Sequence, residues 1–221
     1  TTEFTGSPAS LPATLAKHVR FTGAAALAAD LIVNQNVTVA SSGSLAIGPH
    51  TLNVGGIFAL TNSATFSMTD AASVLDVAGA VTINGQSTSG LLTAGELRVA
   101  GNFTQGSGSV HAAAFAPSGT HRTIFDGTAA QTASFWHPGT TSSRFQHVEI
   151  TGAGGVTFTS NVFTGGDVDV TSALTVASST TTSVGGSLIV RLAATLTNSG
   201  TVNAATCLLS GLLIGTAPVC M

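Results

Sequence analysis

Short triplets, in which two apolar residues flank one variable position, recur along the chain. Typical examples are Leu31-Ile32-Val33, Val37-Thr38-Val39, Leu45-Ala46-Ile47 and Leu52-Asn53-Val54. The period of two is typical of a β-strand that buries one face. The triplets start at positions 31, 37, 45, 52, 58, 66, 75, 81 and 97. Except where one strand is skipped around Leu91-Leu92, the spacing leaves room only for tight bends between them. The pattern therefore predicts many short strands.

The distance in sequence from one triplet to the triplet three strands later is nearly constant along the chain. The triplets that start at positions 31, 37 and 45 have counterparts at 52, 58 and 66, and those at 52 and 75 have counterparts at 75 and 97. A fixed period of this length, roughly 21 to 23 residues, is the sequence signature of a solenoid. We therefore expect an all-β, right-handed parallel β-solenoid with about three short strands per turn of about 20–23 residues. Dividing roughly 190 residues by the period predicts about eight to nine turns. The residues expected to point inward include Val54, Val77, Val99 and Val184.

A glycine recurs with the same period. We interpret five of these glycines as structural corners between strands, where a residue without a side chain adopts a positive φ without strain. They are Gly56, Gly79, Gly101, Gly166 and Gly186. A β-sandwich is the alternative fold, but it requires neither the fixed period nor a recurring corner glycine.

The regular spacing of the triplets is lost between residues 106 and 147. Phenylalanines recur there at every tenth position, as Phe115, Phe125, Phe135 and Phe145. Regular triplets return at residue 148. We expect residues 21–221 to form a single solenoid with an irregular insert at about 106–147. Residues 1–20 do not match the repeat and are predicted to be an N-terminal cap or an assembly arm.

Composition narrows the class of protein. Only 7% of the 221 residues are charged, whereas 34 are Thr and 24 are Ser, so hydroxyl groups dominate the polar surface. The formal net charge of −3 provides no basic footprint for nucleic acid. The mean hydropathy of +0.46 argues against disorder. Scarce charge and abundant small polar residues are typical of a secreted structural protein, which predicts an extracellular or cell-surface location.

Two cysteines lie close together near the C-terminus. Cys207 and Cys220 fit one disulfide in an oxidising compartment, and two isolated buried thiols are the alternative. The apolar stretch from Cys207 to Val219 is interrupted by polar residues, glycine and proline, and is shorter than the roughly 20 residues of a membrane span. We expect late strands there and no membrane span.

The densest polar group lies in and beside the insert. Four of its members form a candidate contact site for a glycan or partner, namely Trp136, Arg144, His147 and Glu149. Trp136 would be a stacking platform and Arg144 a donor, and a purely structural insert is the alternative. The histidines lack the spacing of a zinc signature, so no metal or cofactor is expected.

Catalysis is not expected. Asp167 and Asp169 would share one strand face, but nothing nearby in sequence completes a set of six oxygen ligands for a cation. The sequence contains no GxSxG, P-loop, HExxH or CxxC motif. No catalytic residue is therefore assigned.

Several segments resemble the repeats of large bacterial secreted β-helix proteins, which include filamentous-haemagglutinin-like and autotransporter-passenger adhesins. The segments are 123–132, 145–150, 154–159 and 165–168, and the similarity of pattern covers roughly residues 30–200. The resemblance implies a right-handed β-helix on a cell surface or in a fibre, and it carries over no catalytic residues.

Together these observations predict a non-enzymatic, extracellular structural or adhesive solenoid. It is expected to self-assemble into a fibre or layer and to contact further copies of itself, glycans or a host surface. A Thr-rich ice-binding solenoid is one alternative, disfavoured because outward positions vary, as in Thr38, Ala59, Asp76 and Arg98. A β-helix protein that binds or degrades polysaccharides is another, and the enzyme is disfavoured because clustered acids are missing.

Overall fold

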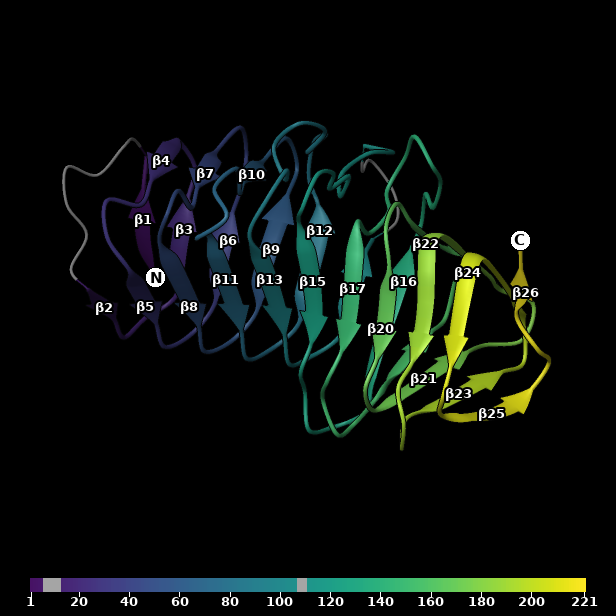
Figure 1. Ribbon diagram of the computed structural model, residues 1–221. Coiled ribbons are helices and arrows are strands. Elements are labelled where there is room, and N and C mark those ends of the chain that lie inside the picture. The colour runs from purple at the N-terminus through teal and green to yellow at the C-terminus, as the bar shows by residue number, and fades with distance from the viewer. Residues whose placement is uncertain (6–12, 107–110) are drawn as a thin grey trace.

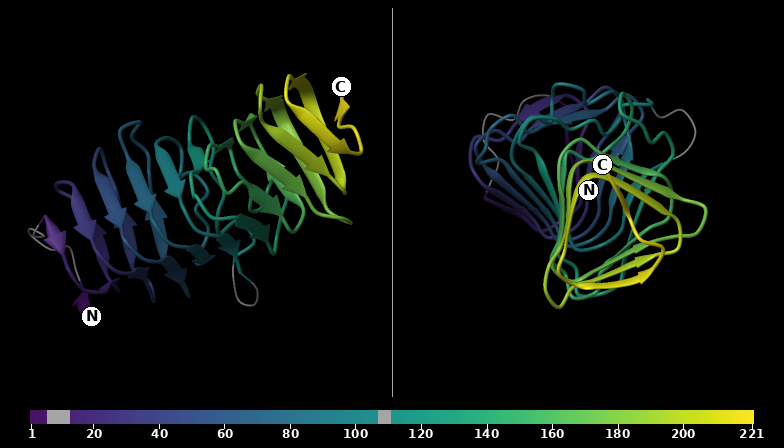
Figure 2. Two further views of the ribbon diagram at one scale, coloured as in Figure 1. Left: turned by 90° about the horizontal axis from the view of Figure 1, so that it is seen from below. Right: turned by 45° about the vertical axis from the view of Figure 1, so that its right-hand side comes forward.

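The computed structural model describes residues 1–5, 13–106 and 111–221. In these ranges all the secondary-structure elements are β-strands, and the paired strands all run parallel. Figures 1 and 2 show the strands stacked in successive layers from the N-terminal turn to the C-terminal turn. The protein is therefore a β-solenoid, as the period of the triplets predicts.

Two long sheets run the length of the solenoid. Sheet A contains, in spatial order, β1 (Thr2–Phe4), β3 (Val19–Phe21), β6 (Val37–Val39), β9 (Phe58–Thr61), β12 (Val81–Asn84), β14 (Phe103–Gln105), β16 (Gln131–Phe135), β18 (Val156–Phe158), β21 (Ala173–Val176), β23 (Thr195–Asn198) and β25 (Leu212–Gly215). Sheet B contains β2 (Thr14–Leu15), β5 (Leu31–Val33), β8 (Thr51–Val54), β11 (Val74–Val77), β13 (Glu96–Val99), β15 (Arg122–Phe125), β17 (His147–Ile150), β20 (Val168–Val170), β22 (Thr181–Val190), β24 (Thr201–Leu209) and β26 (Val219–Cys220).

A third face is formed in two separate stretches. In the N-terminal half it is sheet C, which consists of β4 (Ala24–Ala26), β7 (Ser44–Ala46) and β10 (Thr65–Ser67). In the C-terminal half, β19 (Val162–Thr164) pairs with the first part of the long strand β22. The register of β22 shifts between Val184 and Ser187, so that its second part continues sheet B.

The observed registers confirm the predicted period. Leu31 pairs with Leu52, Val37 with Phe58 and Leu45 with Phe66, which agrees with sheets stacked about 21 residues apart. Sheet A contributes about one strand per turn, and the coil has about ten turns. The expected eight to nine is too low because strands β1 and β2 already lie within residues 1–20. The described residues of that range thus continue the repeat, and residues 6–12 lie outside the described part.

Inward side chains form stacked columns. Val54, Val77 and Val99 pair in register and are essentially inaccessible to solvent, as predicted. Val184 is also buried, but it stacks between Thr164 and Ala204 in the other stretch of the third face. The alternation of buried and half-buried residues along each strand therefore places one continuous apolar core inside the coil.

The insert at about 106–147 widens the turns while the core continues through it. Strands β15 and β16 lie within it and keep the parallel pairing of sheets B and A, while residues 107–110 lie outside the described part. Leu97 pairs with Thr123 and Phe103 with Ala133, so the register steps are longer here than in the regular turns. The four regularly spaced phenylalanines are all buried, with ring centroids 4.8–6.4 Å apart in the contacts among them. Aromatic rings thus fill the wider interior.

The five corner glycines have a different physical role from the predicted one. None of them has a positive φ; among described residues the positive-φ glycines are Gly48, Gly90, Gly95, Gly119, Gly155 and Gly215. Gly56, Gly79 and Gly101 instead stack on one another. A Cβ at Gly79 would lie 2.5 Å from the carbonyl oxygen of Gly56, and one at Gly101 would lie 2.5 Å from that of Gly79. Close approach of successive turns, and not backbone strain, therefore excludes a side chain there.

Gly166 and Gly186 belong to another corner, before strands β20 and the second part of β22. A Cβ at Gly166 would collide with the imidazole of His147, and one at Gly186 would lie 2.9 Å from the carbonyl carbon of Gly166. The expected single column of five glycines is therefore two separate columns.

Cys207 and Cys220 form a disulfide with a Cα–Cα distance of 5.8 Å. Cys207 is in register with the buried Leu188, and Cys220 with the buried Ala204. Because both partners are inward positions, the disulfide crosses the interior of the last turn, from β24 to β26.

The glycine stacking generates a stability prediction. Gly101→Val should lower the free energy of unfolding by about 1–3 kcal/mol, because the new side chain must push the Gly79 corner away. Gly139→Val is the matched control, since a Cβ there meets only the Ser142 side chain, at 3.4 Å. Denaturant unfolding measures both. Equal stability of the two variants would contradict the stacking role.

Candidate functional site

Charged residues are concentrated on the outer face of sheet B and at its edges from β11 to β22. Six of the nine carboxylates lie there, Asp76, Glu96, Asp126, Glu149, Asp167 and Asp169, and so do three of the six basic residues, Arg98, Arg122 and Arg191. Six negative and three positive charges give −3, which equals the formal net charge of the whole chain. The remaining three acids and three bases balance one another. We call this surface the charged face.

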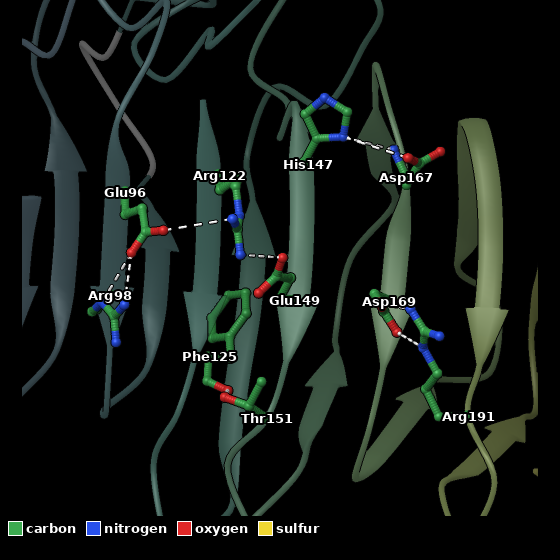
Figure 3. Close-up of polar contacts among 10 residues, drawn as sticks. All are labelled: Glu96, Arg98, Arg122, Phe125, His147, Glu149, Thr151, Asp167, Asp169 and Arg191. Carbon is green, nitrogen blue, oxygen red and sulfur yellow. Dashed lines mark hydrogen bonds and ion pairs between the residues drawn. The ribbon is translucent and has the colours of Figure 1, made fainter. Parts of the chain in front are cut away.

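Ion pairs connect neighbouring turns across the charged face. Arg122 on β15 lies between Glu96 on β13 and Glu149 on β17, with its Nη1 3.6 Å from Glu96 Oε1 and its Nη2 paired with Glu149 Oε1 (Figure 3). Glu96 also accepts hydrogen bonds from Arg98, at 2.7 and 3.2 Å. The bond to Glu96 raises the pKa of Arg98 above its ordinary value. A single guanidinium thus bridges the carboxylates of two turns.

A second set of contacts joins β17, β20 and β22. Arg191 donates two hydrogen bonds to the carboxylate of Asp169, at 2.9 and 2.6 Å. The backbone N–H of Asp167 donates to Nδ1 of His147, at 3.2 Å, and Oδ1 of Asp167 accepts from the backbone N–H of Ser187, at 2.7 Å. Because Nδ1 of His147 is an acceptor, the proton of the neutral ring is on Nε2.

These two sets of contacts border a groove of about 280 Å³. It is lined by Thr120, Arg122, His147, Val148, Glu149, Asp167, Asp169 and Ile189. Glu149 and Asp169 lie directly opposite each other on adjacent strands, an arrangement of like charges that weakens a sheet unless cations compensate it. Arg122 and Arg191 provide that compensation from either side.

The structure brings together only half of the predicted contact site. His147 and Glu149 both line the groove. Trp136 follows β16 in sheet A and is 60% exposed, and Arg144 donates to the carbonyl of Ser142. Within the described residues, no hydrogen bond, ion pair or ring contact joins Trp136 to the other three.

Sequence reasoning missed the groove roles of Asp169 and Ile189. Both follow from the regular register beyond the insert, where Glu149 pairs with Asp169 and Asp169 with Ile189. Counting one period onward from Glu149 could have found these positions.

His121 lies beneath this region in an apolar environment. It is fully buried, its ring is 6.0 Å from that of Phe115, and both of its ring nitrogens lack a hydrogen-bond partner. Burial, together with the nearby His147, lowers the pKa of His121 to about 4. The imidazole is therefore neutral at physiological pH.

The outer face of sheet A differs completely from the charged face. From β6 to β25 none of its strands contains a charged residue. Threonines form an outward column in which Thr132, Thr157, Thr175 and Thr197 pair in successive turns. Thr38, Ala59, Thr82 and Thr104 form the corresponding column in the N-terminal half. The sequence disfavours a threonine face because its outward residues vary, but the residues compared there come from two sheets. Asp76 and Arg98 lie on sheet B.

Across residues 1–5, 13–106 and 111–221, no group of three or more His, Cys, Asp or Glu side chains has a geometry that could hold a metal ion. In the same ranges no helix has the length and apolar character needed to cross a membrane.

Comparison with protein-family models, with curated proteins and with solved structures gives no match to this chain.

Burial of His121 predicts a pH dependence of stability. With a folded pKa of about 4 and an unfolded pKa of about 6.5, the unfolded chain binds the proton first, so stability falls as the pH drops from about 6.5 through 4. The loss from this group is about 3 kcal/mol. His121→Phe should remove it, and His137→Phe, at a partly exposed position, should not. Urea unfolding between pH 7 and 3.5 measures the difference; parallel curves for wild type and His121→Phe would contradict the assignment.

Proposed function

We propose that the protein is a non-enzymatic, extracellular structural or adhesive solenoid that self-assembles into a cell-surface fibre or layer. The observation that carries the proposal is a belt of exposed apolar side chains around the last turn. The belt consists of Leu208 (59% exposed), Leu212 (58%), Ile214 (47%) and Val219 (56%).

The belt side chains point outward, so further turns of the same coil would not enclose them in its core. Leu208 is in register with Ile189, which follows Asp169 in the same outward column. Ile214 continues the column of Thr175 and Thr197. Outward positions that hold polar residues in earlier turns thus hold apolar residues in the last turn, on more than one face. Because exposed apolar side chains gathered on one turn indicate an interaction site, a second copy of the chain is the proposed partner.

Charge supports association of like copies. The last charged residue in the sequence is Arg191, so the belt carries no charge that would repel an identical surface. The disulfide and the low charge content support an extracellular location, together with the resemblance to secreted β-helix adhesins.

The arrangement of the carboxylates supports a non-enzymatic role. Hydrolysis of glycosidic bonds requires one carboxyl that is protonated and a second that acts as base or nucleophile. On the charged face, Glu96 and Glu149 share the guanidinium of Arg122, and Asp169 binds Arg191. These ion pairs hold the three carboxylates in structural contacts between turns.

The assembly proposal is tested by sedimentation. Wild-type protein should sediment as oligomers in both low and high salt, because apolar burial is not screened. Leu208→Asp should shift the distribution to monomers. Ile32→Asp is the matched control, since Ile32 is also outward on sheet B and 44% exposed but lies far from the belt. A wild-type protein that remains monomeric at high concentration in both salts would exclude self-assembly.

Ice binding is a second candidate function, favoured by the threonine column on the uncharged outer face of sheet A. Adjacent strands lie about 4.8 Å apart, so Thr157, Thr175 and Thr197 present hydroxyl and methyl groups at a regular interval. Such an array can hold an ordered layer of water that merges with an ice lattice. The segregation of charge to sheet B leaves this face free of strongly hydrated ions.

The ice candidate predicts a face-specific loss of activity. Wild-type protein should inhibit ice recrystallisation, and Thr175→Lys should abolish the inhibition because a long hydrated side chain interrupts the ordered water. Thr65→Lys, at an outward position of sheet C, should retain it. Wild-type protein without effect on ice, or equal losses in the two variants, would exclude this function.

A further inference from the structure

The groove on the charged face carries an unassigned set of binding groups. We propose that it binds one uncharged sugar unit of a polysaccharide. This inference rests on the adhesive part of the proposed function and names the class of ligand that such adhesion would use.

Hydrogen-bond acceptors lie on one side of the groove. Oε1 of Glu149 is paired with Arg122, and no hydrogen bond from a described residue reaches Oε2. Oδ1 of Asp167 accepts from the Ser187 N–H, whereas Oδ2 is 3.8 Å from Nδ1 of His147. Two carboxylate oxygens are thus available on adjacent strands. Hydroxyl groups of a sugar ring are donors that suit ionised acceptors.

Hydrogen-bond donors complete the arrangement. Nδ1 of His147 accepts from the backbone of Asp167, which leaves Nε2–H of the neutral ring as a donor. The guanidinium of Arg122, whose side chain is 41% exposed, lines the groove and adds N–H donors. Thr120 adds a hydroxyl at the border of the groove. A ligand that both donates and accepts hydrogen bonds fits this lining better than a purely cationic or purely anionic one.

Charge and size select an uncharged sugar unit. Arg122 balances Glu149, and Arg191 balances Asp169, so the excess charge of the groove is the single carboxylate of Asp167. That carboxylate opposes uronic or sulfated sugars. The apolar side chain of Ile189 offers a contact for the C–H face of a sugar ring. The volume of about 280 Å³ is just below the range of pockets for drug-sized ligands, which suits a single ring.

The lining residues Arg122, Glu149 and Asp169 lie on neighbouring strands of sheet B (Figure 3), and the groove that they border is open and not a closed cavity. Neighbouring units of a polysaccharide can therefore extend to either side of the bound ring. Repeated solenoids in a fibre would present many such grooves to one polysaccharide, and multivalency would then strengthen individually weak contacts.

The experiment titrates the full-length protein with neutral, amino and uronic oligosaccharides while NMR follows the ring protons of His147. Neutral oligosaccharides should shift the His147 signals with millimolar affinity. Glu149→Gln should weaken binding at least tenfold, because it removes the charge of an acceptor. Ile189→Arg should block the groove without removing an ion pair, which keeps the test valid if Glu149→Gln is unstable. Trp136→Ala, outside the groove, is the control and should bind as wild type.

Three results would overturn the inference: no binding of any neutral oligosaccharide, equal affinity in wild type and Ile189→Arg, or stronger binding of the amino or uronic series. Sedimentation of the same samples separates the two proposals. Loss of sugar binding with assembly intact refutes the groove alone, whereas monomers that still bind sugar refute self-assembly alone.

Discussion

Parallel backbone pairing along the solenoid axis is the constraint on which the rest of the structure depends. In sheets A and B, each strand between the first and last turns pairs with the previous and the following turn, so every turn must return to the same register. This requirement explains why an apolar residue such as Leu52 stacks between Leu31 and Leu75. It also explains why corner glycines such as Gly79 have no room for a side chain.

The same stacking converts outward positions into chemically distinct faces. A side chain that points outward lies directly beside its equivalents one turn before and one turn after. On sheet B this brings Arg122 between two carboxylates, and on sheet A it aligns threonines such as Thr157 and Thr175. The proposed functions therefore depend on columns that run across turns, and each column combines residues that lie a full period apart in the sequence.

The sequence alone predicts the architecture well because the period is local and repeated. The pairs Leu31–Leu52 and Leu52–Leu75 can be derived by counting residues. The site could not be predicted in the same way, because the turns of the insert have irregular lengths. Arg122 and Glu149 are neighbours although more than a regular turn of sequence separates them, whereas Trp136 and His147 are closer in sequence and belong to different sheets. Only the pairing register of the strands shows which of these residues are neighbours in space.

Because the net charge is concentrated on sheet B, the molecule is negative on one side of the solenoid axis and neutral on the side of sheet A. Two copies with parallel axes repel when their charged faces meet, and they do not when their sheet A faces meet. A layer built from such copies would consequently have two dissimilar sides. One would be an electrolyte-sensitive surface of paired carboxylates and guanidinium groups such as Asp169 and Arg191, and the other a neutral, hydroxylated sheet. Orientation within the assembly would then decide which chemistry the surroundings encounter.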